Sequence, residues 1–129
     1  MTDLFLTALG LLVLLQVKHL FADYFLQTAR MLSGRDEYLH LGRVQHAGLH
    51  AAFSLLAFLI VGATLVPALL ICLAEGIVHY HIDWAKGRHG AARAYGPQDA
   101  GFWRAFGVDQ FAHQITYVAM IWLWGAYAL

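Results

Sequence analysis

Apolar residues form four long runs along the chain, at residues 4–27, 46–63, 66–86 and 106–128. A helix that crosses a hydrocarbon core takes ~20 residues, and each run approaches that length, although the second is short. The connection around Gly62 is tight and Pro67 lies near the next start, so the second and third helices should pack antiparallel. The pattern predicts an all-α integral membrane protein in which residues 1–129 form one four-transmembrane-helix bundle.

Composition supports a membrane protein and excludes several other classes. Hydrophobic residues make up 60% of the chain and charged residues 12%, and the mean hydropathy is +0.60, outside the range of ordinary soluble domains. The formal net charge of zero argues against a nucleic-acid partner. Cys72 is the single cysteine, which excludes an intrachain disulfide and a CxxC motif, so a metal must be held by His and carboxylate.

Positive charge indicates an orientation. The start of the chain lacks a basic segment and a cleavage site, so we interpret it as a retained first span. All Lys and Arg residues except Lys18 lie in or beside the connections 28–45 and 87–105: Arg30, Arg35, Arg43, Lys86, Arg88, Arg93 and Arg104. The positive-inside rule places both connections in the cytoplasm and both termini outside. Lys18 either snorkels to the interface or belongs to a buried site.

Polar residues inside the four runs recur at helical spacing, so each set occupies one helix face. The sets are His19, Asp23 and Gln27; His46 and His50; Glu75, His79, Asp83 and Lys86; and Asp109 and His113. With a rise of ~1.5 Å per residue, all four sets come out near the cytoplasmic end of antiparallel helices. Because each charge costs a few kcal/mol at the bilayer centre, a common depth indicates a shared polar site.

Two segments suggest an internal repeat. KHLFADY (18–24) and VHYHIDW (78–84) share HxxxD followed by an aromatic residue, and each precedes a helix that begins with HxxxH or DxxxH. The pattern favours two tandem helical hairpins related by an axis along the membrane normal, with chance similarity as the alternative.

The residue types point to a metal centre. His and Asp one helical turn apart can bind one ion together, and four converging helices can supply ligands for one or two ions. Zinc is the first choice, with manganese or iron as alternatives. The candidate ligands are His19, Asp23, His46, His50, His79, Asp83, Asp109 and His113, with His81 as an additional possibility. Alternatively, these groups only hydrogen-bond one another and lock the helices together.

The ordered motifs KHLFADYFLQ, HxxxH, HYHIDWAK and DQFAH resemble those of the bacterial membrane proteins grouped as domain-of-unknown-function family 3307. A looser similarity runs to small inner-membrane metal-dependent hydrolases. The resemblance implies a multi-pass protein of the bacterial inner (cytoplasmic) membrane and favours His46 over His50. It marks as site residues His19, Asp23, Gln27, His79, Asp83, Lys86, Asp109, Gln110 and His113.

If the site is catalytic, hydrolysis by metal-activated water is the simplest mechanism. Lys86 then neutralises a developing oxyanion or phosphate, or it only meets the helix dipole and lipid headgroups. Asp109 and either His46 or His50 complete the ligand set or relay protons, and Gln27 and Gln110 orient ligands. Glu75 is a general base, a ligand, or a hydrogen-bond partner of the histidine one turn away.

A site one turn inside the cytoplasmic interface suits an amphiphilic or lipid-linked phosphate or ester. Membrane lipid is therefore the expected partner, and a homo-oligomer is compatible with the sequence. The rival functions are a divalent-cation or proton transporter or channel, a non-catalytic membrane subunit with a structural His/Asp cluster, and a di-iron oxygenase. Against transport, segments 11–15, 55–61, 66–71 and 121–124 offer an ion no polar group.

Overall fold

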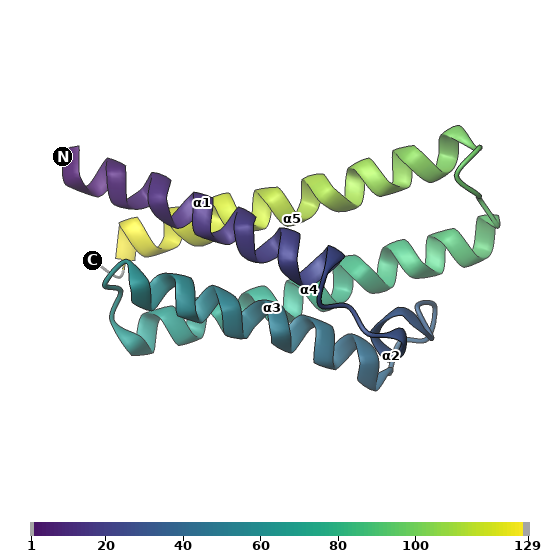
Figure 1. The fold of residues 1–129 in the computed structure, drawn as a ribbon, viewed down its shortest axis with the longest axis horizontal. Coiled ribbons are helices and arrows are strands. Elements are labelled where there is room, and N and C mark those ends of the chain that lie inside the picture. Colours follow the sequence, from purple (N-terminus) through teal and green to yellow (C-terminus); the bar gives the residue numbers. More distant parts are fainter. Residues whose placement is uncertain (1, 128–129) are drawn as a thin grey trace.

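The protein is all-helical over residues 2–127, the part of the chain that the computed structural model describes. The helices are α1 (Thr2–Tyr24), α2 (Ala29–Leu32), α3 (Leu41–Ile60), α4 (Leu65–Arg93) and α5 (Ala100–Tyr127), shown in Figure 1. The predicted all-α class is confirmed, and residues 2–127 contain no strand. The final residue of the fourth predicted run, Ala128, lies outside the described residues.

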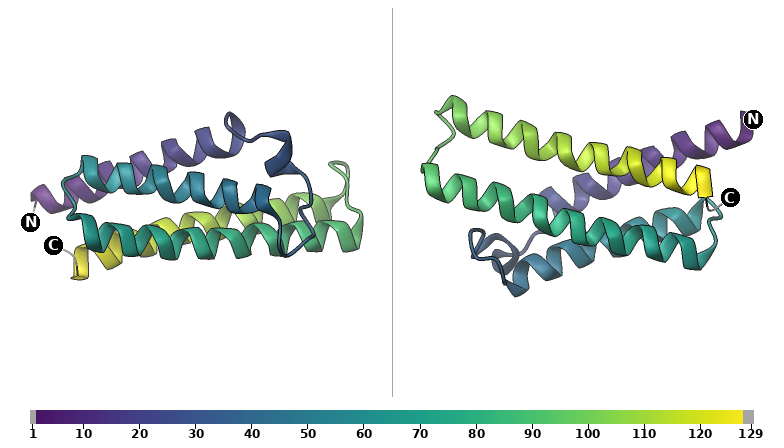
Figure 2. Two further views of the ribbon diagram at one scale, coloured as in Figure 1. Left: turned by 90° about the horizontal axis from the view of Figure 1, so that it is seen from below. Right: turned by 180° about the vertical axis from the view of Figure 1, so that it is seen from behind.

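The four long helices lie lengthwise beside one another (Figures 1 and 2). α3 packs against α1 and α4, and α5 packs against α4 and α1, so the order around the assembly is α1, α3, α4, α5. The start of α1, the end of α5 and the α3–α4 turn lie at one end, which we call the termini end. The short α2 and the α4–α5 connection lie at the opposite end, which we call the loop end.

The α3–α4 turn has the geometry that its sequence predicts. Gly62 has a φ of +85°, a region that favours glycine, and it follows the last turn of α3. The amide of Ala63 donates to the Phe58 carbonyl at 3.0 Å, and the amide of Gly62 donates to Leu59 at 3.1 Å. This Schellman-type ending reverses the chain and sets α3 and α4 antiparallel, as expected.

Helix boundaries differ from the predicted ones. α1 ends at Tyr24 instead of residue 27, α3 begins at Leu41 instead of 46, α4 continues to Arg93 instead of 86, and α5 begins at Ala100 instead of 106. α3, α4 and α5 continue beyond their apolar runs into polar sequence, whereas α1 ends before its run does. Gly87 does not break α4: a Cβ there would lie 2.1 Å from the Arg35 carbonyl oxygen, so glycine permits close contact with the α1–α3 connection.

Arg43 belongs to α3 and organises the connection that precedes this helix. Its buried guanidinium lies 5.3 Å from the centre of the Tyr80 ring. It donates hydrogen bonds to backbone carbonyls of the connection: Gly34 at 3.1 Å, Arg35 at 2.5 Å, Tyr38 at 3.2 Å, and Glu37. Arg43 was predicted to lie in a loop. Instead it belongs to α3, and its guanidinium binds backbone carbonyl groups inside the fold.

The interior changes character along the helices. Towards the termini end the core is apolar and contains Leu11, Leu15, Phe58 and Trp124. Towards the loop end ten buried residues are polar or charged, including five histidines. Large apolar side chains instead face outward on every long helix: Val13 is 59% exposed, Ile60 62%, Leu70 63% and Phe111 65%. A polar interior inside an apolar surface reverses the arrangement of a water-soluble protein.

Two helices are long and apolar enough to cross a membrane: α1, over Asp3–Tyr24, and α4, over Leu65–Arg93. In the other two long helices, polar residues interrupt the apolar sequence. In α3 these include Arg43, His46 and His50, and in α5 Asp109 and His113, all of which are buried.

Gly87→Ala should destabilise the protein, whereas Gly90→Ala should not. The added methyl group at position 87 would meet the Arg35 carbonyl, and overpacking of this kind costs about 1–3 kcal/mol. Nothing lies within 4 Å of a Cβ at Gly90, so alanine there should add about 0.5–1 kcal/mol of helix stability. Thermal unfolding in detergent micelles measures both changes, and equal melting temperatures for the two variants would contradict the close contact.

Candidate metal centre

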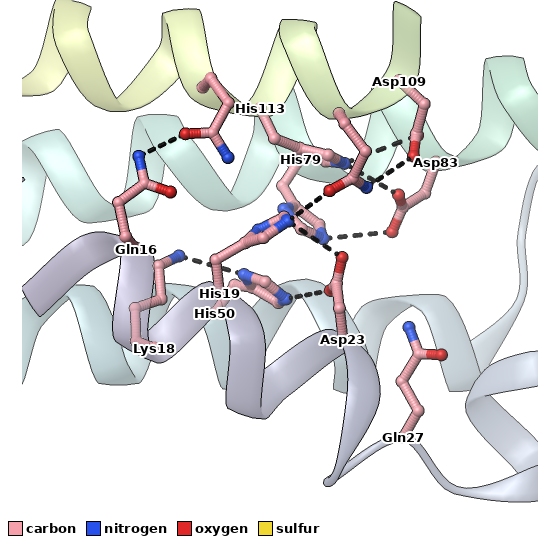
Figure 3. A network of polar contacts seen from close by, with 12 residues as sticks. Gln16, Lys18, His19, Asp23, Gln27, His50, His79, Asp83, Asp109 and His113 are labelled. Atoms are coloured by element: carbon pink, nitrogen blue, oxygen red, sulfur yellow. Dashed lines mark hydrogen bonds and ion pairs between the residues drawn. The ribbon is translucent and has the colours of Figure 1, made fainter. Parts of the chain in front are cut away.

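Five histidines from the four long helices point into one buried centre. α1 supplies His19, α3 supplies His46 and His50, α4 supplies His79 and α5 supplies His113, and all five are buried. The ring centroids of His50 and His79 are 3.9 Å apart, and those of His79 and His113 are 4.3 Å apart. Figure 3 shows rings from opposite sides of the assembly meeting in this centre. The structure thus brings together the polar helix faces that the sequence places at a common depth.

Asp23 lies among three of these imidazoles. Its Oδ1 is 2.9 Å from His50 Nε2 and 3.3 Å from His46 Nε2. Its Oδ2 is 3.3 Å from His19 Nε2, one helical turn earlier in α1. Within residues 2–127 no lysine or arginine forms an ion pair with Asp23, so its contacts are with histidine alone.

Asp83 has a matching position on the opposite side. Its Oδ2 is 3.1 Å from His79 Nε2 and 3.6 Å from His46 Nε2, and its Oδ1 is 3.3 Å from His113 Nε2. The described residues again provide no lysine or arginine partner. The Asp83–His113 contact corresponds to the Asp23–His50 contact in the two similar segments of the sequence. His46 touches both carboxylates and so joins the two halves of the centre.

Two sets of donor atoms are close enough to hold a metal ion. One set is Asp23, His46, His50 and His79, and the other is His79, Asp83 and His113; within each set the donor atoms lie within 4.8 Å of one another. His79 belongs to both sets; its buried Nδ1 has no hydrogen-bond partner, and its Nε2 meets only the Asp83 carboxylate, at 3.1 Å. A buried imidazole whose Nε2 faces a carboxylate and other imidazoles fits a metal ligand.

The outer nitrogens of two histidines are held by partners farther from the centre. His19 Nδ1 lies 2.8 Å from the Tyr117 hydroxyl, and His50 Nδ1 lies 3.0 Å from the Lys18 amine. Such contacts fix ring orientation, and Nε2 of each ring consequently points at Asp23. Sequence reasoning missed Tyr117, although it lies one turn beyond His113 on the same face of α5.

The two glutamines that were predicted to orient ligands do contact them. Gln27 Nε2 lies 3.2 Å from His46 Nε2, although Gln27 follows the end of α1. Gln110 accepts with Oε1, 3.0 Å from His19 Nε2, and donates with Nε2 to Asp109 Oδ2 at 3.1 Å. Gln110 thereby connects the centre to the Lys86 side of the site.

Lys18 and Glu75 form a buried ion pair one level deeper in the interior. Lys18 is 6% exposed and contacts both Glu75 and His50, so the interpretation of Lys18 as a snorkelling side chain is wrong. Glu75 belongs to neither donor set and contacts Lys18. The alternatives of Glu75 as ligand or as partner of His79 therefore have no contact to support them.

Lys86 and Asp109 form a second ion pair at the loop end of the centre. The Lys86 amine donates to Asp109 Oδ2 at 2.8 Å, and Asp109 Oδ1 lies 3.6 Å from His113 Nε2. Asp109 belongs to neither donor set; it contacts His113 directly and is connected to His19 through Gln110. Lys86 and Asp109 line a pocket of about 200 Å³, and Asp23, His46 and Asp83 of the centre line the same pocket. This pocket gives access to the centre.

Over residues 11–128 the chain matches the family described as "Protein of unknown function (DUF3307)". The chain belongs to this family. The match spans every motif of the centre, so the resemblance stated from those motifs is confirmed. No curated protein and no solved structure matches the chain. Similarity to metal-dependent hydrolases therefore stays a prediction.

The remaining histidines of this DUF3307 chain lie outside the centre. His81 contacts the Tyr38 hydroxyl at 3.0 Å and the Ile77 carbonyl at 2.7 Å, so the suggestion of His81 as an additional ligand is wrong. Its position two residues after His79 turns it to a different face of α4. His40 packs over Gly34, and His89 is exposed.

His79→Gln should remove more bound metal than a change in either set alone. His79 is common to both sets, whereas Asp23→Asn affects only the first and His113→Gln only the second. Loss of a residue that only hydrogen-bonds to a metal ligand lowers metal affinity about 10–100-fold. Loss of the ligand His79 itself should therefore lower metal affinity at least as much. Metal per chain, measured by mass spectrometry after purification with zinc, tests this, with His81→Gln as the matched control. Full metal content in His79→Gln would contradict the ligand assignment.

Lys18→Met should be more damaging than the double change Lys18→Met with Glu75→Leu. Removal of one partner of a buried ion pair leaves an uncompensated charge and costs about 3–5 kcal/mol, whereas apolar replacement of both is often nearly neutral. Unfolding measurements on the two single variants and the double variant give the coupling directly. Additive effects would show that the two side chains do not depend on each other.

Proposed function

We propose that this protein is a membrane-embedded, metal-dependent hydrolase that acts on an amphiphilic phosphate or ester at the loop end of four membrane-crossing helices. The observation that carries the proposal is the balance of buried charge. Glu75 is paired with Lys18 and Asp109 with Lys86, but Asp23 and Asp83 face only histidines. Half-buried carboxylates without a lysine or arginine partner are costly, and one or two divalent cations held by the two donor sets, which do not include the predicted ligand His19, would offset that cost.

The apolar exterior supports a four-transmembrane-helix arrangement. α3 exposes Ile60 and α5 exposes Phe111 to the same extent as α1 and α4 expose their apolar residues. The histidines of α3 and α5 and Asp109, which lower the hydropathy of these helices, are buried at the centre, where lipid does not reach them. Lysine and arginine concentrate at the loop end, so the positive-inside rule favours a cytoplasmic loop end in a bacterial inner membrane.

The chemistry of the donors suits hydrolysis. A divalent ion of the zinc, manganese or iron type acts as a Lewis acid and lowers the pKa of a water molecule when bound. Lys86 lies at the wall of the pocket, where its amine can neutralise negative charge that develops on a substrate oxygen. Asp109 holds that amine in place through its 2.8 Å contact.

The shape of the interior favours an enzyme over a transporter or channel. The pocket opens among loop-end residues, including Arg35 and Phe102. Towards the termini end the interior is filled by an apolar core that contains Leu11, Leu15 and Trp124. An ion that left the centre in that direction would meet the Lys18–Glu75 ion pair and then this largely apolar core.

The test is a hydrolysis assay in lipid nanodiscs, with zinc and a panel of lipid phosphates and carboxylic esters. The proposal predicts turnover that requires metal and is lost in Asp83→Asn. Lys86→Met should lower kcat about 10²–10³-fold while metal content stays unchanged, because the amine acts on the substrate and binds no ion.

Liposome flux assays with the same preparation separate the rival functions. Flux of divalent cations without hydrolysis would indicate a transporter. Absence of bound metal, hydrolysis and flux together would indicate a structural cluster. His81→Gln serves as the control, because this histidine lies on the same helix but outside the centre.

A further inference from the structure

A groove of about 560 Å³ runs along the outer side of α4 and α5 at the loop end. Its deep part is lined by apolar residues, Ile82 from α4 and Val108 and Ala112 from α5. The Val108 side chain is 69% exposed, so the groove opens on the outer surface of the helix assembly. The right panel of Figure 2 shows α4 and α5 side by side along the length that forms the groove.

The groove and the pocket over the metal centre share part of their walls. Lys86, Tyr95, Ala105 and Asp109 line both of them. The Lys86–Asp109 ion pair therefore lies between the apolar groove and the polar pocket. Through Asp109, whose Oδ1 is 3.6 Å from His113 Nε2, the groove reaches the edge of the centre.

Two other apolar grooves lack this connection. The groove between α1 and α3 and the groove between α3 and α4 share no lining residue with the pocket. Lys18 is the only charged residue that lines the α1–α3 groove, and it is already paired with Glu75. The α4–α5 groove thus differs from the other two grooves in two ways. It adjoins the pocket, and it is lined by Arg104, which forms no ion pair within the described residues.

The order of residues along the groove identifies the class of ligand. Arg104 and His89 lie at the loop end, Lys86 in the middle, and Ile82 and Ala112 at the deep end. Arg104 and Ala112 are eight positions apart on α5, which corresponds to ~12 Å along the helix. The one acidic residue in the groove, Asp109, is already bound to Lys86. Cationic groups above an apolar channel complement an anionic head on a hydrocarbon chain.

We infer that the α4–α5 groove binds the hydrocarbon chain of a membrane lipid that carries a phosphate headgroup, with the phosphate between Arg104 and Lys86. The inference rests on the proposed function, because it describes how the substrate of that same centre is held. It adds a specific site for the chain and a route from the membrane to the pocket. Lys86 lines both the groove and the pocket, so it lies where the lipid site adjoins the metal centre.

The test is photo-crosslinking of the whole protein in phosphatidylcholine nanodiscs with a phosphatidic acid that bears a diazirine on its acyl chain. We expect the label on peptides that contain Ile82, Val108 or Ala112. Unlabelled phosphatidic acid should compete, whereas inorganic phosphate and phosphatidylcholine should not, because one lacks the chain and the other a net anionic head.

Ala112→Phe should reduce the labelling roughly tenfold, because its ring would occupy the deep end of the groove. Ala119→Phe places the same ring on an exposed position of the same helix and should leave labelling unchanged. Arg104→Gln should weaken labelling, and Arg104→Lys should retain it. If Ala112→Phe fails to fold, the mapped label on the parent protein decides the question.

Labelling spread over all helices, or competition by phosphatidylcholine as strong as by phosphatidic acid, would overturn the inference. The assay needs neither metal nor turnover, so its result is independent of the hydrolysis assay. Groove labelling without hydrolysis would refute the proposed enzyme and keep the lipid site. Hydrolysis without groove labelling would refute the lipid site and keep the proposed enzyme.

Discussion

The structure depends on how buried carboxylates are compensated inside a protein whose exterior is apolar. The buried Glu75 and Asp109 have lysine partners, whereas the half-buried Asp23 and Asp83 meet imidazoles only. Carboxylates at this depth require either cations or protonated partners, because low-dielectric surroundings penalise an isolated charge. Every long helix contributes a group to this compensation, so the same contacts that balance charge also fix the four helices relative to one another.

The sequence allowed the centre to be predicted because helical geometry is regular. HxxxD and HxxxH place two side chains on one face, and the spacing from helix ends sets their depth. Those two facts led to His19, His50, His79 and His113, which the structure brings together. The helix ends were less predictable, because three of the long helices continue beyond their apolar runs into polar sequence and α1 ends before its run does.

The contacts of single side chains were beyond sequence reasoning. Nothing in the spacing distinguishes a lysine that snorkels from one that, like Lys18, turns inward to Glu75 and His50. Arg43 looks like a loop charge until its carbonyl partners are seen, and Gly87 looks like a helix breaker until Arg35 is found against it. In each case the deciding partner comes from a distant part of the chain, which local periodicity does not encode.

The most direct measurement is anomalous diffraction from crystals grown with zinc, recorded on both sides of the zinc absorption edge. The account predicts a peak bonded to His79 at about 2.0–2.1 Å, together with nitrogen and oxygen donors from Asp23 or Asp83 and the neighbouring histidines. One peak would indicate a shared ion, and two peaks a dinuclear centre. Absence of anomalous signal at this centre, with the five imidazoles hydrogen-bonded among the carboxylates, would contradict the account and leave a structural cluster.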